Sequence, residues 1–516
     1  MNRAIYKIGR ILAVGIMMFG TTSCEDWFDV APESEMTFDD FWKEKNDVLS
    51  AVGACYRAMN EEWFLKKMIA WGEVRSDNVI FGKGDETDLT YILTANINAA
   101  NGYAKWGEFY TVINYCNTVI KYAPGVRNND PDFSEAELNR YLAEAKAIRA
   151  FCYFTLVRTF NEVPYIVEPY DDDSKPYQVA QSTAEDILNA LITDLKSVED
   201  VAPVVYTNTE YNKGRITQKA IWALIADMYL WLDDYQNCIT YCNKVLNTTT
   251  NPLSLVRSSA YFTSVFFNGN SDESIWELQF DANTQNNAVR DLYGGASNSD
   301  PKLSSYDFSV STSGLFNAKD LRLTNALVSS NGYYLIKKYI ANRTNTNAST
   351  VKESDFVYGT GDNNWIIYRL PDIYLMKAEA LAELGGTDNL TQAVALVSKT
   401  YDRANPDLEP NSLEGKYTTQ EQVRNLVFDE KQREFLFEGK RYFDMVRRMR
   451  RQGSPTEIIN TYLINKYIAM NLDQTTVMSK LNDVDAIYMP IHQDELRLNR
   501  LLKQNRFYMV SSDITK

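Results

Sequence analysis

The sequence contains a single histidine, His492, among 516 residues. Mechanisms that need a histidine paired with a carboxylate, two imidazole metal ligands or a histidine pH switch therefore have at most one residue available. The sequence also lacks a nucleophile elbow, a Walker loop and a zinc-protease helix. We therefore expect a protein that is not an enzyme and that uses no cofactor.

Positive charge is scarce relative to negative charge. The chain has 53 Lys and Arg residues against 68 Asp and Glu residues, which gives a net charge of −15. Such a field repels phosphate backbones, so we expect no nucleic-acid partner. Aromatic residues reach 13%, and the 33 Tyr outnumber the 23 Phe. Tyrosine suits half-exposed positions, because its ring is apolar and its hydroxyl is polar.

The apolar run near the N-terminus is too short to cross a membrane. Ile11–Gly20 would rise about 15 Å as a helix, half of a bilayer core of roughly 30 Å. Three cations and no acid precede it, so residues 1–23 are predicted to be a secretory signal peptide. Residues 21–24, Thr-Thr-Ser-Cys, are similar to a bacterial lipobox, which predicts a lipid on Cys24 that anchors the mature chain to a membrane. The alternative is ordinary cleavage nearby with Cys24 incidental.

The other cysteines are odd in number: Cys55, Cys116, Cys152, Cys238 and Cys242. They lie in apolar helical patterns, where cysteine packs as a small hydrophobic residue. We predict buried thiols rather than disulfides. Cys238 and Cys242 have a spacing that suits a metal, but no second pair completes four ligands, so we expect no metal site.

Apolar residues recur at three- and four-residue spacing along most of the mature chain, which predicts a mainly α fold. The predicted helices cover residues 47–62, 105–122, 134–158, 182–198, 217–231, 234–247, 368–384, 389–400, 419–437 and 440–451. Capping boxes are predicted at three helix starts, Ser134 with Glu137, Ser182 with Glu185, and Thr418 with Glu421.

One helix pair resembles a tetratricopeptide (TPR) repeat. Small, aromatic and turn residues stand at the repeat's offsets: Ala226, Tyr229, Asp233, Tyr235, Cys238 and Cys242. Antiparallel helices pack closely only where small side chains face each other. Alanines at 378, 382 and 393 repeat the pattern, so we predict a TPR-like scaffold of helical hairpins, over about 35–250 and again over about 368–516.

Residues 250–367 have a different composition. They are rich in Asn, Ser, Thr and Gly, with short alternating runs at 275–280 and 333–336. This pattern predicts an irregular, loop-rich region with a few short strands. Residues 76–104 are similar, and binding surfaces usually lie on loops held by a rigid scaffold. We predict that the two segments form one face.

Several sequence blocks are characteristic of one family. They are AEAKAIRAFCYFTLVRTFNEVPYI at 143–166, DEKQREFLFEGKRYFDMVRR at 429–448, the alanine-rich helix at 369–385 and the closing segment at 489–508. Together they resemble the SusD/RagB family of outer-membrane lipoproteins from Bacteroidetes. Asn161 replaces a usual glycine, and Lys440 and Tyr442 stand where His and Trp are more common. The resemblance covers nearly the whole mature chain and implies a single SusD-like domain over 24–516.

The resemblance implies a glycan-binding surface lipoprotein. Such proteins sit over a SusC-like TonB-dependent channel and help pass oligosaccharides into it. Glu25-Asp26 resembles the signal that directs such lipoproteins to the outside of the outer membrane. Sugar sites pair aromatic platforms with polar side chains, and the candidates chosen for aromaticity near loops are Trp71, Tyr91, Tyr293 and Tyr306.

Two other functions stay open. A RagB-like peptide receptor would need backbone-pairing edges and charged pockets. A surface glycoside hydrolase would need two carboxylates flanking a cleft, but the spacing of Glu434, Glu438 and Arg441 favours structural ion pairs along one helix. Residues 171–173, Asp-Asp-Asp, suit calcium less well than a solvated acidic turn.

Overall fold

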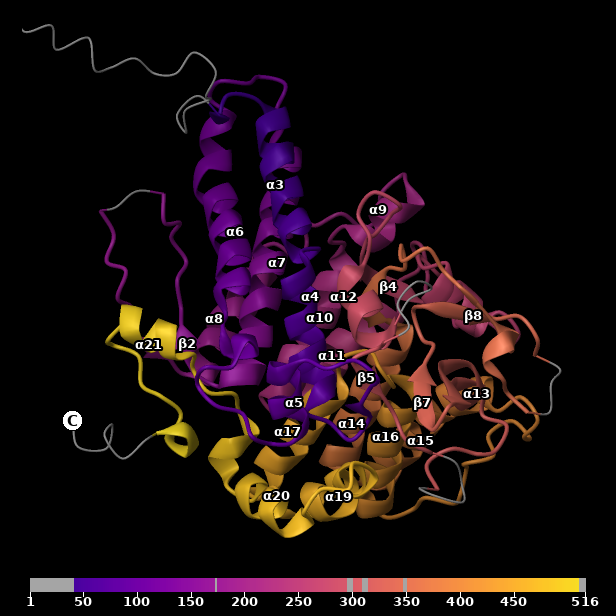
Figure 1. The fold of residues 1–516 in the computed structure, drawn as a ribbon. Helices are drawn as coiled ribbons and strands as arrows, with labels where there is room; N and C mark the ends of the chain where they lie inside the picture. The colour runs from indigo at the N-terminus through magenta and orange to yellow at the C-terminus, as the bar shows by residue number, and fades with distance from the viewer. Residues whose placement is uncertain (1–40, 172–173, 295–299, 309–313, 347–349, 510–516) are drawn as a thin grey trace, which may run out of the picture.

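The computed structural model describes residues 41–171, 174–294, 300–308, 314–346 and 350–509 (Figure 1). The predicted signal peptide, Cys24 and Glu25-Asp26 lie outside these ranges. Within them, no helix combines the length and the apolar character needed to cross a membrane.

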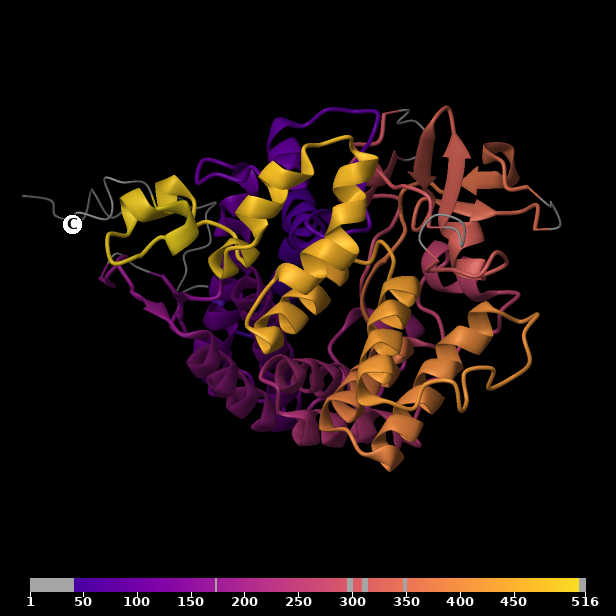
Figure 2. The same ribbon diagram turned by 90° about the horizontal axis from the view of Figure 1, so that it is seen from below.

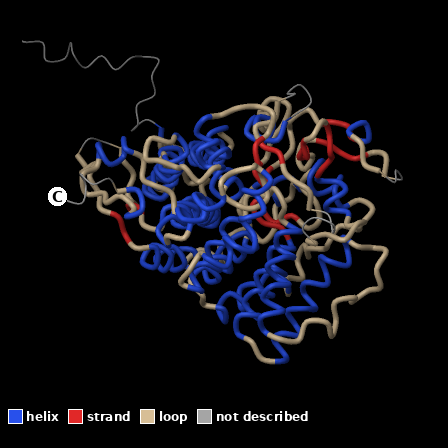
Figure 3. The backbone as a smooth tube through the Cα atoms, turned by 60° about the horizontal axis from the view of Figure 1, so that its bottom comes forward, coloured by secondary structure: helices blue, strands red, loops and turns tan. Residues whose placement is uncertain are grey.

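Helices form most of the described chain, and the strands are few and short (Figure 3), which confirms the mainly α fold class. The α-helices are α3 (Lys45–Met59), α4 (Glu62–Ile69), α5 (Thr87–Leu93), α6 (Gly107–Val126), α7 (Glu135–Phe160), α8 (Ala184–Lys196), α9 (Thr209–Gly214), α10 (Gln218–Trp231), α11 (Tyr235–Leu246), α12 (Asn287–Val289), α13 (Leu321–Ala326), α14 (Leu370–Leu384), α15 (Thr387–Ala404), α16 (Gln420–Glu434), α17 (Arg441–Gln452), α18 (Thr456–Ile458), α19 (Ile464–Ala469), α20 (Gln474–Leu481) and α21 (Gln493–Leu498).

The strands pair in two-stranded antiparallel sheets. They are β1 (Ile80–Phe81) with β5 (Leu303–Ser304), β2 (Val163–Pro164) with β3 (Gln181–Ser182), β4 (Ser274–Leu278) with β10 (Trp365–Arg369), β6 (Leu327–Ser330) with β7 (Tyr333–Ile336), and β8 (Ala341–Arg343) with β9 (Phe356–Tyr358). Strand β4 begins one residue before the predicted run at 275–280 and covers its first four residues, and β7 coincides with the predicted run at 333–336.

Every predicted helix has an observed counterpart, but two of the three predicted caps are displaced. The Ser134 box is confirmed, since its side chain accepts from the Glu137 amide and Glu137 reaches back. Helix α8 is capped by Thr183 instead of Ser182, because Ser182 pairs with Val163 in the β2–β3 sheet. Helix α16 likewise begins one residue late, with Thr419 as the cap. Adjacent hydroxyl residues compete for the cap, and tertiary pairing decides between them.

The scaffold consists of packed helical hairpins, as predicted. Helices α10 and α11 pack together, α11 packs on α14, and α14 and α15 pack on α16. Figure 2 shows these magenta and orange helices side by side along one edge of the molecule. The small residues of the repeat pattern lie at these contacts, each at most 1% exposed: Ala226, Cys238, Cys242, Ala378, Ala382 and Ala393. All five described cysteines are free and buried, which confirms the thiol prediction.

The two loop-rich segments meet, as predicted. Strand β1 of the first segment pairs with β5 of the second. The Ser305 hydroxyl donates to the Asn78 carbonyl at 2.6 Å, and the Tyr306 hydroxyl donates to the Asp77 carbonyl at 2.6 Å. Asp77 in turn accepts hydrogen bonds from Gln432 on α16 and from Arg441, the first residue of α17 (Arg441–Gln452), so the joined loops rest on the helical scaffold.

Candidate functional site

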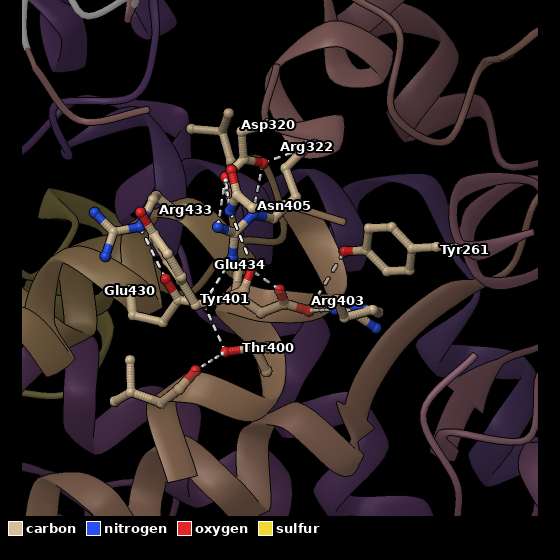
Figure 4. Close-up of polar contacts among 12 residues, drawn as sticks. Tyr261, Asp320, Arg322, Thr400, Tyr401, Arg403, Asn405, Glu430, Arg433 and Glu434 are labelled. Atoms are coloured by element: carbon tan, nitrogen blue, oxygen red, sulfur yellow. Dashed lines mark hydrogen bonds and ion pairs between the residues drawn. The ribbon is translucent and has the colours of Figure 1, made fainter. Parts of the chain in front are cut away.

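The two acids that a glycosidase would use are held in a buried ionic core. Arg369 is fully buried and lies 3.1 Å from Glu273, 2.5 Å from Glu434 and 2.7 Å from Glu438. Figure 4 shows Glu434 among further partners, including Arg322 and Arg403. Burial alone would raise the pKa of Glu434, but Arg403, Arg369 and Arg322 outweigh burial and hold the pKa well below its usual range.

This geometry corrects the predicted local pairing of Glu434, Glu438 and Arg441. Helix α16 ends at Glu434, and Phe437 has a φ of 65°, so the three residues do not share one helix face. Arg441 instead pairs with Asp77, 3.0 Å away. Burial alone would raise the pKa of Glu438. The charges of Arg369 and Lys338 outweigh burial and lower this pKa to about 2. Both carboxylates are therefore structural counter-ions, which agrees with the structural role expected of them.

The acidic run at 171–173 is described only at Asp171. Its carboxylate accepts hydrogen bonds from Lys121 at 2.5 Å, from Lys175 at 2.9 Å and from the Tyr122 hydroxyl. The hydrogen bond from Lys121 is the largest cause of a lowered Asp171 pKa. The prediction of a solvated turn is wrong for Asp171, whose side chain is 3% exposed and paired. In the described residues, no three His, Cys, Asp or Glu side chains are grouped to hold a metal ion.

Two of the four aromatic candidates lie in the hydrophobic core, which contradicts their choice as stacking platforms. Trp71 is 1% exposed, donates its indole N–H to the Tyr103 carbonyl at 2.8 Å and packs against Phe109. Tyr293 is also 1% exposed, and its hydroxyl donates to the Phe437 carbonyl at 3.2 Å. The segments that carry them turn inward as π-helical turns at 70–74 and 290–294.

The other two candidates lie nearer the surface. Tyr306 is half-buried. Its hydroxyl donates to the Asp77 carbonyl, and its ring centroid lies 4.6 Å from that of Phe308. Tyr91 on α5 is 39% exposed. Tyr91 is thus the candidate from sequence whose ring a ligand could reach directly.

Two further exposed rings accompany Tyr91, and the sequence analysis missed both. Trp63, in the first turn of α4, is 45% exposed and its ring lies 5.6 Å from that of Tyr103. Tyr333, at the start of β7, is 36% exposed, and the Lys83 ammonium lies 5.8 Å from its ring centroid. Helix α5 contacts β1, and β7 contacts β5. We call Trp63, Tyr91, Tyr333 and the β1–β5 pair the loop face. A signal was present for Tyr333, which directly follows the turn residues Asn331-Gly332.

A chain of ion pairs connects the parts of the loop face. Lys66 bonds Asp291 at 2.6 Å, Lys302 bonds Asp291 at 2.8 Å and Glu86 at 3.0 Å, and the Tyr103 hydroxyl donates to Glu86 at 2.7 Å. Burial lowers the pKa of Lys66, but hydrogen bonds to Asp291 and Glu62 outweigh it and raise the pKa overall. The charges therefore neutralise one another and join α4 to Asp291, to Lys302 just before β5 and to Glu86 just before α5. The groups of the loop face that a ligand could contact are therefore the rings of Trp63, Tyr91 and Tyr333.

Glu73 is a buried carboxylate in the π-helical turn at 70–74 that follows α4. It is fully buried and accepts hydrogen bonds from the Asn78 amide at 2.7 Å and from the backbone N–H groups of Phe437 and Gly439 at 3.0 and 2.9 Å. Burial raises the pKa of Glu73 from 4.5 to about 7, although these hydrogen bonds oppose the rise.

Glu73 should make stability fall as the pH rises from about 4.5 to about 7. Because the folded-state pKa lies above the ordinary value of 4.5, the native chain keeps a proton in this window that the unfolded chain has released. The contribution of Glu73 to the free energy of unfolding should fall by about 2–3 kcal/mol, at roughly 1.4 kcal/mol per pKa unit. Urea unfolding at pH 5 and pH 8 measures this fall. Glu73→Gln has no carboxyl to ionise at this position, so its stability relative to wild type should be higher at pH 8 than at pH 5. Equal pH dependence in the two proteins would contradict the assignment.

A scaffold of helical hairpins that carries a rigid, ring-bearing loop face defines a binding protein, and comparison with known proteins gives its family. Residues 292–508 match the model of the SusD family, and residues 26–230 match a model described as starch-binding and associating with the outer membrane. The chain belongs to the SusD/RagB family. Proteins of this family are non-catalytic binding proteins associated with the outer membrane.

Relatives share the fold over most of their length. A SusD-like protein of Formosa agariphila is 24% identical over 482 residues, which cover 85% of this chain and 90% of the relative. A SusD superfamily protein of Bacteroides thetaiotaomicron superposes with a TM-score of 0.69 at 21% identity, covering 91% of this chain and 99% of that one. Surface glycan-binding protein A from Bacteroides uniformis gives 0.68 at 23% identity, with coverages of 90% and 99%. A laminarin-binding SusD-like protein gives 0.66 at 20%, with the same coverages.

Proposed function

We propose that this chain is an outer-membrane lipoprotein, anchored through Cys24 and facing the cell exterior, that binds glycans and delivers them to a SusC-like TonB-dependent channel. The observation that carries the proposal is the set of three exposed rings on the loop face, Trp63, Tyr91 and Tyr333. Two proteins of the same fold, one named as a surface glycan-binding protein and one as a laminarin-binding protein, support it.

The chemistry of the loop face suits a neutral sugar. Pyranose rings carry apolar C–H faces that stack on aromatic rings, and their hydroxyls exchange hydrogen bonds with neighbouring polar groups. The charged side chains nearby already pair with one another, as Lys302 does with Glu86 and Asp291. An uncharged ligand would therefore bind without breaking the ion pairs that hold the face together.

Removing a ring from the loop face should weaken glycan binding and leave the fold intact. We expect Trp63→Ala and Tyr91→Ala each to cost about 1–3 kcal/mol of binding free energy, by analogy with other ring-stacking contacts. Calorimetric titration with neutral oligosaccharides at low and high salt measures the loss. Tyr115→Ala, at an exposed ring on α6, is the matched control.

Salt separates this function from peptide binding. A neutral sugar releases no counter-ions, so added salt should change its affinity little, whereas a charged peptide should bind more weakly as salt rises. If Trp63→Ala and Tyr91→Ala bind sugars like wild type, the loop face is not the site. If peptides alone bind, with strong salt dependence, the glycan function is wrong.

The anchoring proposal predicts that Cys24→Ala removes the protein from the membrane fraction. A diacylglycerol at Cys24 would hold an otherwise water-exposed chain on the bilayer, and alanine cannot carry it. In whole cells, added protease should cut wild type and spare the variant, which would stay inside the outer membrane. Unchanged fractionation of Cys24→Ala would exclude the lipid anchor.

A further inference from the structure

A cleft of about 890 Å³ opens between α3, α9 and the turns at 267–270 and 358–364. It shares no residue with the loop face. Figure 1 places α3, α9 and β4, which border the cleft, above α5, β5 and β7, which border the loop face. Its volume lies within the range of about 300–1,000 Å³ that is usual for small-ligand sites.

Carboxamides supply the polar lining of this cleft, which we call the amide cleft. They are Asn60, Asn268, Asn270, Gln279, Asn363 and Asn364. Asn270 and Gln279 exchange reciprocal hydrogen bonds at 2.9 and 3.0 Å, and Asn364 donates to Gln279 at 3.1 Å. Both N–H donors of Gln279, Asn363 and Asn364 are used within the protein. Each carboxamide has two N–H donors and two acceptor lone pairs, so Asn60 and Asn270, which make fewer bonds, keep donors and acceptors for a ligand. Within the described part of the chain, the exposed Asn268 side chain makes no hydrogen bond at all.

The charged residues of the cleft are either paired or at its rim. The Arg215 guanidinium is bound by Glu144, with its Nε 3.0 Å and its Nη2 2.5 Å from the two carboxylate oxygens. The Tyr56 hydroxyl donates to the same carboxylate at 2.6 Å. Glu210, Asp281 and Asp362 are exposed at the mouth. The interior therefore offers neutral donors and acceptors rather than a free charge.

Aromatic rings line the same walls. Tyr211 on α9 is 50% exposed, and Phe267 and Tyr358 are half-buried at the opposite turns. Rings beside carboxamides form the combination that recognises sugars, because the rings cover C–H faces and the amides match hydroxyls as both donors and acceptors.

A glycine in the middle of α3 keeps the cleft open. A β-carbon at Gly53 would meet no atom within 4 Å, so the cleft has room for a side chain at this position. Glycine within a helix is destabilising relative to alanine. Glycine at position 53 therefore makes α3 less stable than alanine would, and a larger side chain at this position would project into the cleft.

We propose that the amide cleft is a second binding site, which takes a neutral oligosaccharide. It goes beyond the proposed function, which requires only the loop face. An anionic ligand gains nothing from Arg215, whose charge is committed to Glu144, and the acids at the mouth repel it. Sugar hydroxyls instead find neutral donors and acceptors on Asn60, Asn268 and Asn270.

Gly53→Phe tests the cleft directly, because the new ring would fill the cleft from a position without steric conflict. Gly125→Phe is the matched control, since a β-carbon at Gly125 on α6 also meets nothing within 4 Å. The probes are maltohexaose, laminarihexaose, cellohexaose, xylohexaose and mannohexaose, titrated calorimetrically. We expect wild type and Gly125→Phe to bind two molecules of one of these probes per chain, and Gly53→Phe to bind one.

Further variants separate failure of the cleft from failure of the proposed function. Tyr211→Ala, at a side chain that is 50% exposed, should weaken cleft binding about tenfold or more. A Trp63→Ala/Tyr91→Ala double variant should lose loop-face binding and keep the cleft. If Gly53→Phe and Tyr211→Ala bind like wild type while the double variant binds nothing, the cleft proposal is overturned and the proposed function stands. If none of the five sugars binds wild type, both are overturned.

Discussion

Replacing Arg369 by methionine should lower the free energy of unfolding by about 3–5 kcal/mol, the cost of breaking a buried ion pair from one side. Arg369 is fully buried at the end of β10 and bonds Glu273, Glu434 and Glu438. Burial alone would lower its pKa, but Glu438 and Glu434 raise it well above the ordinary value, so the guanidinium is charged at every physiological pH. Methionine fills a similar volume and leaves these carboxylates without their central cation.

Urea unfolding at neutral pH measures this loss. The control is Arg57→Met, because the Arg57–Glu61 pair is 3.6 Å long with side chains 65% and 62% exposed, and such pairs contribute at most about 1 kcal/mol. The pH dependence gives a second readout. Since the folded-state pKa of Glu438 is about 2, its contribution is present above 4.5 and is lost as the pH falls toward 2. Arg369→Met should lose less stability than wild type as the pH falls from 4.5 toward 2. If Arg369→Met and Arg57→Met lowered the free energy of unfolding equally, the ionic core would be contradicted.

The ion pairs of the buried core could be predicted from the sequence only in part. The spacing of Glu434, Glu438 and Arg441 indicates a structural role, and the structure agrees. Their partners lie elsewhere in the chain: Arg369 is 65 residues before Glu434, and Asp77 is 364 residues before Arg441. Local spacing predicts pairs within a helix. It contains no information on which distant charge a fold brings into contact.

Periodicity predicted the long helices well and the short ones poorly. Helices α7, α10 and α14 were predictable because buried residues recur along several turns. The predicted helix at 47–62 is in fact α3 followed by a break at Asn60-Glu61 and a new helix, α4. A short helix contains too few turns to establish a period, and nucleating it depends on tertiary contacts.

Trp63, one of the two exposed rings that the sequence analysis missed, lies just after this break. Trp63 lies in the first turn of α4 and is exposed, and the sequence pattern did not predict a helix over residues 62–69. Trp71 and Tyr293 were chosen for being aromatic and close to loops, and both lie in the core. Composition alone cannot tell whether a ring beside a loop packs beneath the loop or lies on its surface. The two loop-rich segments do meet, as predicted, but their shared composition does not specify the β1–β5 pairing that joins them.

The final prediction is that one substitution, glycine to alanine, acts with opposite sign at two positions. Gly72 lies in the π-helical turn at 70–74, where an added β-carbon would overlap the Gly439 carbonyl and press on the Phe443 ring. The obstacle is backbone, so the 437–439 segment must move and the hydrogen bond from Gly439 to Glu73 must break. We expect Gly72→Ala to lose about 3–5 kcal/mol, from overpacking and from a buried carboxylate left short of a donor.

Gly53→Ala should instead gain about 0.5–1 kcal/mol, because its position in α3 is open and alanine favours helix. Urea unfolding of both variants at pH 5 and pH 8 tests the mechanism as well as the sign. The folded-state pKa of Glu73 is about 7, so its carboxylate is ionised at pH 8 and protonated at pH 5. An ionised carboxylate depends more on its donors, and the loss in Gly72→Ala should therefore be larger at pH 8. A loss of equal size at both pH values would mean that crowding alone acts at Gly72, and that the lost donor to Glu73 contributes nothing.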